Sequence, residues 1–383
     1  MTTEADAGAP APRPGPRAWA GVWTWAGLVA VSMALVLVLQ AVRAPAALLL
    51  GPMAAGVAFG LKGAVIRPSP LAFGAAQALV GCLIAGSATA GFWSGVLAHL
   101  PVYVALAAST LAVTLAFGWV MATRGWLPGT TAIWGLAPGA STAMVLMSEA
   151  FGGDRRLVAM MQYLRLLLVA LLAMGLAQLK GATPGHPPTA WLALGDPAAV
   201  ALTLAFAGIT GWVGKASRLP AGIFLAPMLA GSALQALGVL SLELPVLVAA
   251  FAYAMIGWSI GLGFTRDALA YSARLLPRIL ATLAALLACC GGLAIVVKLA
   301  TGVDWLTAWL ATSPGGTDTI LIIATATPVD LPFILGGQLV RFLMVLAIGP
   351  LLARKLAQRL SPDQTRSPVA ADLPRNPIRR KRP

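Results

Sequence analysis

The chain alternates long apolar runs with short polar loops, and most of the runs have the length of one membrane-crossing helix. A helix needs about 20 apolar residues to cross the ~30 Å hydrocarbon core of a bilayer. The pattern therefore predicts an all-α polytopic membrane protein. The apolar runs lie at about 19–39, 45–61, 71–90, 101–122, 128–151, 157–179, 198–216, 219–238, 245–264, 276–300, 303–327 and 332–353.

Polar segments divide the chain into two membrane units. Residues 1–18 are rich in Ala, Pro and Gly and predict a disordered tail, as does the Pro-rich, basic segment 361–383. A loop rich in Pro and Gly, 181–197, links a first unit, 19–180, to a second unit, 198–360. The first apolar run has no small-residue cleavage site after a short apolar core, so we expect an uncleaved helix and not a signal peptide.

The two units repeat each other at a nearly constant sequence shift. Arg43, Pro45, Pro52, Met53 and Gly56 all recur at one shift, as Arg218, Pro220, Pro227, Met228 and Gly231. After a single inserted residue, Pro101, Pro138, Gly139, Asp154, Gln162 and Arg165 recur as Pro277, Pro314, Gly315, Asp330, Gln338 and Arg341. So many matches of uncommon residues predict an internal duplication.

A Pro-Gly pair interrupts one apolar run in each unit, at Pro138-Gly139 and at Pro314-Gly315. Proline removes a backbone donor and clashes with the preceding helical turn. Inside a bilayer, such a break is tolerated only where the freed backbone groups face protein or water. Matched breaks in the two halves of a chain are a sequence pointer to the binding site of a transporter.

The membrane path of the two broken runs decides the symmetry of the repeats. If each run re-enters as a hairpin, the units have five crossings each and are inverted; if each run spans, they have six and are parallel. Hairpins with a cytoplasmic N-terminus leave only Arg43, Lys180 and Lys298 outside among the loop cations. The positive-inside rule therefore favours about ten crossings plus two re-entrant segments, with both termini cytoplasmic. The parallel arrangement stays open.

The broken runs supply candidate solute-binding residues. Beyond the breaks lie Ser141 and Thr142 in the first run and Gly316, Thr317 and Asp318 in the second. The half-helix after a break offers N–H groups that favour an anion, and the half before it ends in carbonyls that favour a cation. Asp318 is the sharpest candidate, because a carboxylate at membrane depth is costly unless it is paired or hydrated. The alternative for all of these polar side chains is helix capping.

A Gln-x-x-Arg pattern follows each break, as Gln162 and Arg165 and as Gln338 and Arg341. The spacing places Gln and Arg on one face of a helix. We expect the arginines to pair inside the bundle, Arg341 with Asp318 and Arg165 with Glu149. Such pairs either hold the hairpins or bind an anionic solute.

We expect a structural role for two further sets of residues. Asp154 and Asp330 should cap the helices that they precede. Gly257, Gly261 and Gly263 should let helices pack closely.

Composition excludes several other functions. The formal net charge is +14, but the basic residues lie in short loops and in the tail, so we expect no direct nucleic-acid binding. His99 and His186 are isolated, and Cys82, Cys289 and Cys290 have no metal-binding spacing. No nucleophile–base pair stands out either. We therefore expect no metal, no cofactor and no enzymatic activity.

The breaks and the Gln-x-x-Arg patterns resemble those of the AbrB-type membrane family of bacteria. The resemblance covers about 20–360 and is clearest in Pro138-Gly139-Ala140-Ser141-Thr142-Ala143-Met144 and in Pro314-Gly315-Gly316-Thr317-Asp318. Family members often carry a second glycine and a glutamate where Ala140 and Ala143 stand, which puts an acidic role of the first hairpin in doubt. The resemblance implies a polytopic inner-membrane protein, labelled in some members a regulator or an ammonia monooxygenase. The soluble DNA-binding regulators of similar name have another fold, and two isolated histidines do not support the monooxygenase label.

These observations favour a secondary transporter or permease of a small polar solute or ion that binds at the two breaks near the membrane midplane. The alternative is a membrane-bound regulatory or sensory protein that affects gene expression indirectly. The bilayer is the other expected partner, and a homo-oligomer stays open.

Overall fold

The computed structural model describes residues 16–42, 44, 46–64, 66–86, 92–137, 148, 152–179, 196–218, 221–315, 317–325 and 327–359. The predicted tail 361–383 and nearly all of the predicted tail 1–18 and linker 181–197 lie outside these residues. The first helix begins at Pro16, inside the segment predicted to be a tail. Proline is favoured in the first turn of a helix, which extends the helix beyond the apolar run.

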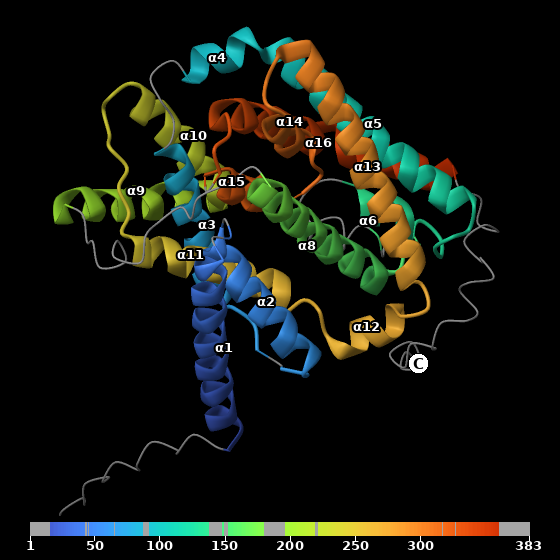
Figure 1. The fold of residues 1–383 in the computed structure, drawn as a ribbon, viewed down its shortest axis with the longest axis horizontal. Helices are drawn as coiled ribbons and strands as arrows, with labels where there is room; N and C mark the ends of the chain where they lie inside the picture. The colour runs from blue at the N-terminus through green and yellow to red at the C-terminus, as the bar shows by residue number, and fades with distance from the viewer. Residues whose placement is uncertain are drawn as a thin grey trace, which may run out of the picture.

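The described residues form α-helices and contain no strand, which confirms the predicted all-α class. The helices are α1 Pro16–Ala41, α2 Ala47–Leu61, α3 Pro70–Ala85, α4 Phe92–Ala98, α5 Leu100–Thr123, α6 Thr131–Leu136, α8 Arg155–Leu179, α9 Pro197–Ala216, α10 Gly222–Ala236, α11 Val246–Gly261, α12 Arg266–Ser272, α13 Leu276–Thr301, α14 Trp305–Thr312, α15 Thr317–Thr325 and α16 Leu331–Arg359 (Figure 1).

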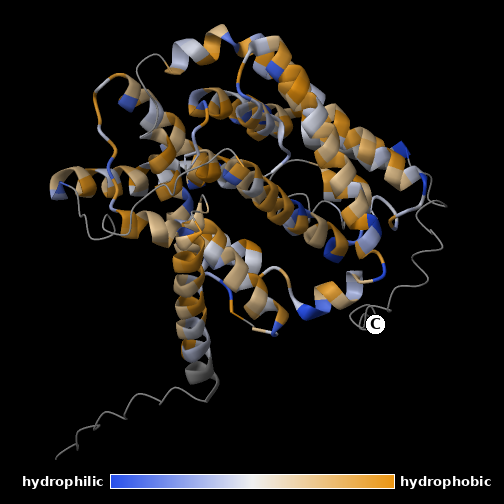
Figure 2. Cartoon of the chain, in the orientation of Figure 1, coloured by the Kyte–Doolittle hydropathy of each residue, from blue (hydrophilic) through white to orange (hydrophobic). Residues whose placement is uncertain are grey.

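Within the described residues, six helices are long and apolar enough to cross a membrane. These are α1, α5, α8, α9, α13 and α16. A seventh crossing is available if α11 and α12, which meet at 44°, form one bent span. Apolar residues cover the length of most helices, while hydrophilic residues gather near helix ends and loops (Figure 2). This arrangement is compatible with a multi-pass membrane protein, whereas ten crossings with two re-entrant segments stay a prediction.

Helices of equal length begin at equivalent positions in the two halves of the chain. α2 and α10 both have 15 residues and contain an internal proline, Pro52 or Pro227. Each follows an alanine with a left-handed backbone, Ala46 at φ 53° and Ala221 at φ 54°. α3 and α11 both have 16 residues. The sequence shift found in the residues therefore also relates the positions of helices.

The helices form two groups, and each group draws helices from both halves of the chain. The first group consists of α1, α2, α3, α9, α10 and α11, and the second of α4, α5, α6, α8, α12, α13, α14, α15 and α16. The chief contacts between the groups are those of α15 with α3, α8 with α11 and α4 with α10. In Figure 1, α5, α6, α13 and α14 lie to one side of α2, α3, α10 and α11.

Glycines allow the closest contacts inside the first group. A Cβ atom on Gly257 of α11 would lie 2.7 Å from the Leu49 carbonyl oxygen of α2, and one on Gly81 of α3 would lie 2.5 Å from the Phe224 carbonyl oxygen of α10. A Cβ atom on Gly261 would overlap the backbone of α2. Gly263, just after α11, contacts the second group instead: a Cβ atom there would meet the ring of Tyr163 of α8 at 2.8 Å. These contacts confirm the packing role predicted for Gly257, Gly261 and Gly263.

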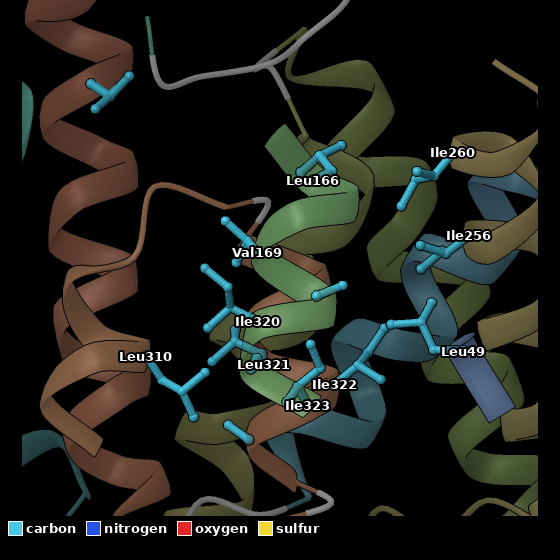
Figure 3. Packing of buried hydrophobic residues seen from close by; sticks show 14 of the residues in the cluster. Leu49, Leu166, Val169, Ile256, Ile260, Leu310, Ile320, Leu321, Ile322 and Ile323 are labelled. Carbon is cyan, nitrogen blue, oxygen red and sulfur yellow. The ribbon is translucent and has the colours of Figure 1, made fainter. Parts of the chain in front are cut away.

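α15 lies in the middle of the molecule. Its residues Ile320, Leu321, Ile322 and Ile323 are all buried, although they point in different directions around the helix. Figure 3 shows Ile320 and Leu321 near Val169 of α8 and Leu310 of α14, and Ile322 and Ile323 on the side away from Leu310. α15 contacts α16 and α8 of the second group and α3 of the first group. Helices of both groups therefore surround the segment that follows the Pro314-Gly315 break.

Candidate functional site

The helix interruption predicted at Pro314-Gly315 is confirmed. α14 ends at Thr312, Ser313 adopts an extended backbone with ψ 134°, and α15 begins at Thr317. A residue that precedes proline is sterically biased towards this extended region, which explains why α14 stops where it does. At about 1.5 Å per residue, α14 and α15 each reach less than half of the ~30 Å apolar core.

In the first half, the short helix before the Pro-Gly pair ends in the same way. α6 ends at Leu136, and Ala137, which precedes Pro138, has ψ 123°. The predicted site residues Pro138, Gly139, Ser141 and Thr142 lie outside the described residues. The comparison of the two breaks therefore rests on the half-helices α6 and α14 and on the helices that contact them.

The Gln-x-x-Arg side chains of α8 bind the carbonyl end of α6. Gln162 Nε2 donates to the carbonyl oxygens of Trp134 at 3.0 Å and Ala137 at 3.2 Å. Arg165 Nη1 donates to those of Leu136 at 3.0 Å and Ala137 at 3.3 Å. Arg165 Nη2 donates to Gln162 Oε1 at 2.6 Å, so the two side chains act as one unit.

The second half repeats this arrangement between α16 and α14. Gln338 Nε2 donates to the Leu310 carbonyl oxygen at 2.7 Å, and Arg341 Nη1 donates to that of Ser313. Arg341 Nη2 donates to Gln338 Oε1 at 2.5 Å and to the Gly315 carbonyl oxygen at 3.3 Å. Leu310 and Ser313 are related to Trp134 and Ala137 by the same sequence shift that relates the two Gln-x-x-Arg patterns. Corresponding carbonyls therefore receive corresponding donors.

The contacts reveal a role that the sequence reasoning missed. The last carbonyls of a helix have no partner within the helix and carry partial negative charge. A break inside the molecule exposes such carbonyls where water is scarce, and the arginine and glutamine side chains satisfy them. Each Gln-x-x-Arg pair is therefore a side-chain cap on the C-terminal end of a half-helix. Charged donors of this kind are stronger than neutral ones.

The arginine–carboxylate pairs that we expected are not seen among the described side chains. The hydrogen bonds of Arg165 and Arg341 go to carbonyl oxygens and to their glutamines. The side chain of Asp318 and all of Glu149 lie outside the described residues, so those pairings stay predictions. Arg165 is 2% exposed and Arg341 3% exposed. Both guanidinium groups are thus buried.

The two arginines approach each other from different halves of the chain. The helices that carry them meet the same two short helices, because α8 and α16 both contact α14 and α15. Packing gives the same picture: a Cβ atom on Gly315 would lie 2.9 Å from Val169 Cγ1, and Val169 lies one helical turn beyond Arg165 on α8. Gly315 in turn accepts the hydrogen bond from Arg341. The caps of both breaks therefore meet around one segment, Pro314-Gly315.

Of the predicted solute-binding residues, the structure brings one set together. Gln162, Arg165, Gln338 and Arg341 gather at the half-helix ends with Pro314 and Gly315. For Thr317 and Asp318 only the backbone is described, in the first turn of α15. Gly316 lies outside the described residues.

Aspartates cap the helices that follow the breaks, as predicted. Asp154 Oδ1 accepts from the backbone of Arg156 at 2.9 Å and of Leu157 at 3.1 Å. Asp330 Oδ1 accepts from that of Phe333 at 3.0 Å. The side chain of Asp154 also accepts from the Tyr271 hydroxyl of α12.

Two threonines that the sequence reasoning missed tie the half-helices to these caps. Thr131 Oγ1 accepts from the backbone N–H of Asp154 at 2.9 Å, and Thr307 Oγ1 accepts from that of Asp330 at 3.1 Å. Each link joins the first turn of a half-helix to the start of the following long helix. Thr131 and Thr307 are related by the same sequence shift as Asp154 and Asp330, and that recurrence is the signal that could have identified them.

Comparisons with known proteins agree with this description. A family model described as "Transition state regulatory protein AbrB" matches residues 48–357. The chain is 40% identical over 316 residues to a protein named "Putative regulator AbrB" from Escherichia coli (strain K12). The aligned residues make up 82% of this chain and 91% of that protein. No solved structure matches the chain. The match over most of the chain confirms the resemblance carried by the Pro-Gly breaks, and the protein belongs to the AbrB family.

Proposed function

We propose that the protein is a secondary transporter or permease that moves a small polar solute and binds it between the two helix breaks. The observation that carries the proposal is the pair of interrupted helices, each with its carbonyl end held by a buried Gln-x-x-Arg pair. Interrupted helices from two related halves, with free helix ends near the membrane midplane, form the binding sites of several transporter folds.

The caps indicate which side of each break is available to the solute. Arg165 and Arg341 occupy the carbonyl ends of α6 and α14. The solute is therefore left the N-terminal end of α15 and, in the first half, the residues that follow Pro138-Gly139. We assign its binding to Ser141 and Thr142 in the first half and to Thr317 and Asp318 in the second, beside the two arginines.

The proposed membrane arrangement consists of two inverted copies of one unit, with ten crossings and two re-entrant broken segments. The six long helices, the bent pair α11–α12 and the three shorter apolar helices α2, α3 and α10 would together supply ten crossings. The equal lengths of α2 and α10 and of α3 and α11 support the duplication. We place the protein in the bacterial inner membrane with both termini cytoplasmic, as the distribution of basic residues favours.

The two helix groups suggest how the solute would change sides. The second group contains both half-helix ends, and it contacts the first group chiefly through α15, α8 and α4. A small movement of the second group against the first would expose the breaks to one side of the membrane and then to the other. Such motion of one helix bundle against another is a common form of alternating access.

Transport by the purified protein in sealed liposomes tests the proposal. Rapid addition of amino acids, carboxylates, amines and monovalent ions should produce uptake of one solute class by the wild type. Asp318→Asn should lose that uptake while the protein still folds, and Asp267→Asn, which changes an exposed carboxylate on α12, should keep it. Wild-type uptake by both Asp318→Ala and Arg341→Ala would contradict the assigned residues.

A membrane-bound regulatory or sensory protein is the second candidate, favoured by the name of the relative from Escherichia coli. Such a protein would bind its ligand at the same breaks and signal through cytoplasmic loops or the basic tail. Deletion of residues 362–383 separates the two candidates. A transporter should keep uptake after the deletion, whereas a sensor that signals through the tail should lose its effect on gene expression.

A further inference from the structure

The space around Pro314-Gly315 holds more positive than negative charge among the described side chains. Arg165 and Arg341 are both buried there, and neither forms an ion pair with a described carboxylate. The carbonyls that they bind carry only partial negative charge. A buried cation is costly unless it is paired. The negative charge must therefore come from a bound anion or from Asp318 of the chain itself, whose side chain lies outside the described residues.

Arg165 also has a donor without a partner among the described residues. A guanidinium carries five N–H donors. Arg165 uses Nη1 for Leu136 and Ala137 and Nη2 for Gln162, whereas its buried Nε has no partner among the described atoms. A buried donor without a partner is unusual in a folded protein and calls for a ligand.

The start of α15 adds a second set of donors beside the arginines. The first N–H groups of a helix have no partner within it and attract anions. α15 begins at Thr317, and the residue before it, Gly316, has no side chain that could cap the helix. Arg341 donates to Gly315, two residues before the helix. Val169, one turn beyond Arg165, packs on the same glycine.

We propose that the solute is an anion, with a carboxylate or another oxyanion group held by Arg165, Arg341 and the N-terminus of α15. This inference rests on the proposed function, because it names the class of solute for the same site. A cationic solute is disfavoured, since the carbonyl ends that would receive it already bind guanidinium groups. Oxyanions with two acceptor atoms match the fork of donors on arginine.

Binding is tested on the purified full chain in detergent at constant ionic strength. Acetate, succinate and inorganic phosphate are compared with acetamide, succinamide and ethylammonium in thermal unfolding. At least one oxyanion should raise the melting temperature in a saturable manner, and its amide should not. Equal stabilisation by amides or amines, or no stabilisation by any oxyanion, overturns the proposal. The proposal is also overturned if an oxyanion stabilises Asp318→Asn but not the wild type. That result would mean that Asp318 already neutralises the arginines within the wild-type chain.

Variants locate the site. Arg165→Gln and Arg341→Gln should weaken binding of the stabilising oxyanion about 10- to 100-fold, the range for loss of charge-assisted hydrogen bonds. Arg341→Lys, which keeps the charge, serves if the glutamine variants do not fold, and should weaken binding at least about 5-fold because the fork is lost. Arg278→Gln removes an exposed cation on α13 and should bind as the wild type does. Unchanged affinity in the Arg165 and Arg341 variants overturns the assignment.

Uptake by liposomes separates this inference from the proposed function. Binding of an oxyanion without uptake would leave the anion site standing and remove the transporter proposal. Uptake of a neutral or cationic solute that the oxyanions do not inhibit would leave the transporter proposal standing and remove the anion site.

Discussion

The capping role of the glutamines makes a quantitative prediction about stability. Gln338→Ala removes the donor to the Leu310 carbonyl oxygen at 2.7 Å and the acceptor of Arg341 at 2.5 Å. The Leu310 carbonyl oxygen keeps the Ser313 hydroxyl as a donor at 3.2 Å, so loss of the Gln338 hydrogen bond costs about 0.5–1.5 kcal/mol. Loss of the hydrogen bond to the charged Arg341 costs about 1.5–3 kcal/mol, so the free energy of unfolding should fall by about 2–4.5 kcal/mol in total.

The equivalent change in the first half should have a similar effect. Gln162→Ala loses the hydrogen bonds to Trp134, Ala137 and Arg165. Gln178→Ala is the matched control, because Gln178 lies on the same helix but is exposed and makes one hydrogen bond, to Val42 at 3.2 Å. It should change stability by less than about 0.5 kcal/mol.

Reversible unfolding in mixed detergent micelles, followed by tryptophan fluorescence, measures these differences. The expected order is a large loss for Gln338→Ala and Gln162→Ala and almost none for Gln178→Ala. If both buried variants lost less than about 1 kcal/mol, the half-helix carbonyls would not depend on these side chains, and the capping argument would be refuted.

Three further predictions follow from single contacts. In the same unfolding assay, Gly257→Ala should destabilise the protein by about 1–3 kcal/mol, because the added Cβ atom would clash with α2. Gly292→Ala is the control: it has open space around it on α13 and should be neutral or stabilising. Thr307→Val should lower the free energy of unfolding by about 1–2 kcal/mol, because it removes the acceptor of the Asp330 N–H. Thr123→Val changes an exposed threonine on α5 and should lower it much less. Equal decreases would contradict the hydrogen-bonded link between α14 and α16. Deletion of 362–383 should leave the melting temperature unchanged, since this segment is Pro-rich and basic and lacks apolar periodicity; a clear decrease would show that the tail packs on the fold.

The helix breaks were predictable because their cause is local. Proline acts on its own turn and on the residue before it, so Pro314 fixes the end of α14 wherever the segment lies. The N-caps of Asp154 and Asp330 were predictable for the same reason, because a cap acts within three residues. The glycine contacts followed from composition, since only small residues let two helix backbones meet.

The partners of the arginines were not predictable, because they are backbone atoms far away in sequence. Arg165 and Leu136 are 29 residues apart, and Arg341 and Ser313 are 28 apart. Sequence spacing showed that Gln and Arg share a helix face, but a carbonyl leaves no signature in the residue type. The search for a charged partner therefore pointed to carboxylates.

Helix ends inside apolar segments were also beyond the reach of the pattern. The run at 219–238 predicts a longer helix than α10, Gly222–Ala236, and the run at 245–264 a longer one than α11. Leu262 and Phe264 follow α11 and are buried although they are not helical, so their apolar character reflects packing. The short helix α12 was not predicted from the apolar pattern, because it lies between two apolar runs. Its N-cap is the Thr265 side chain, which accepts a hydrogen bond from the backbone N–H of Ala268.

Cysteine accessibility tests whether the protein has a binding site between the breaks that opens to both sides of the membrane. The three native cysteines would be replaced, and Thr317→Cys and, as a sidedness control, Arg156→Cys would be introduced singly. A membrane-impermeant thiol reagent is then applied to right-side-out and to inside-out vesicles. We expect labelling of Thr317→Cys from both sides and of Arg156→Cys from the cytoplasmic side alone. Labelling of Thr317→Cys from one side only would contradict alternating access, and labelling of Arg156→Cys only from outside would contradict the inverted arrangement.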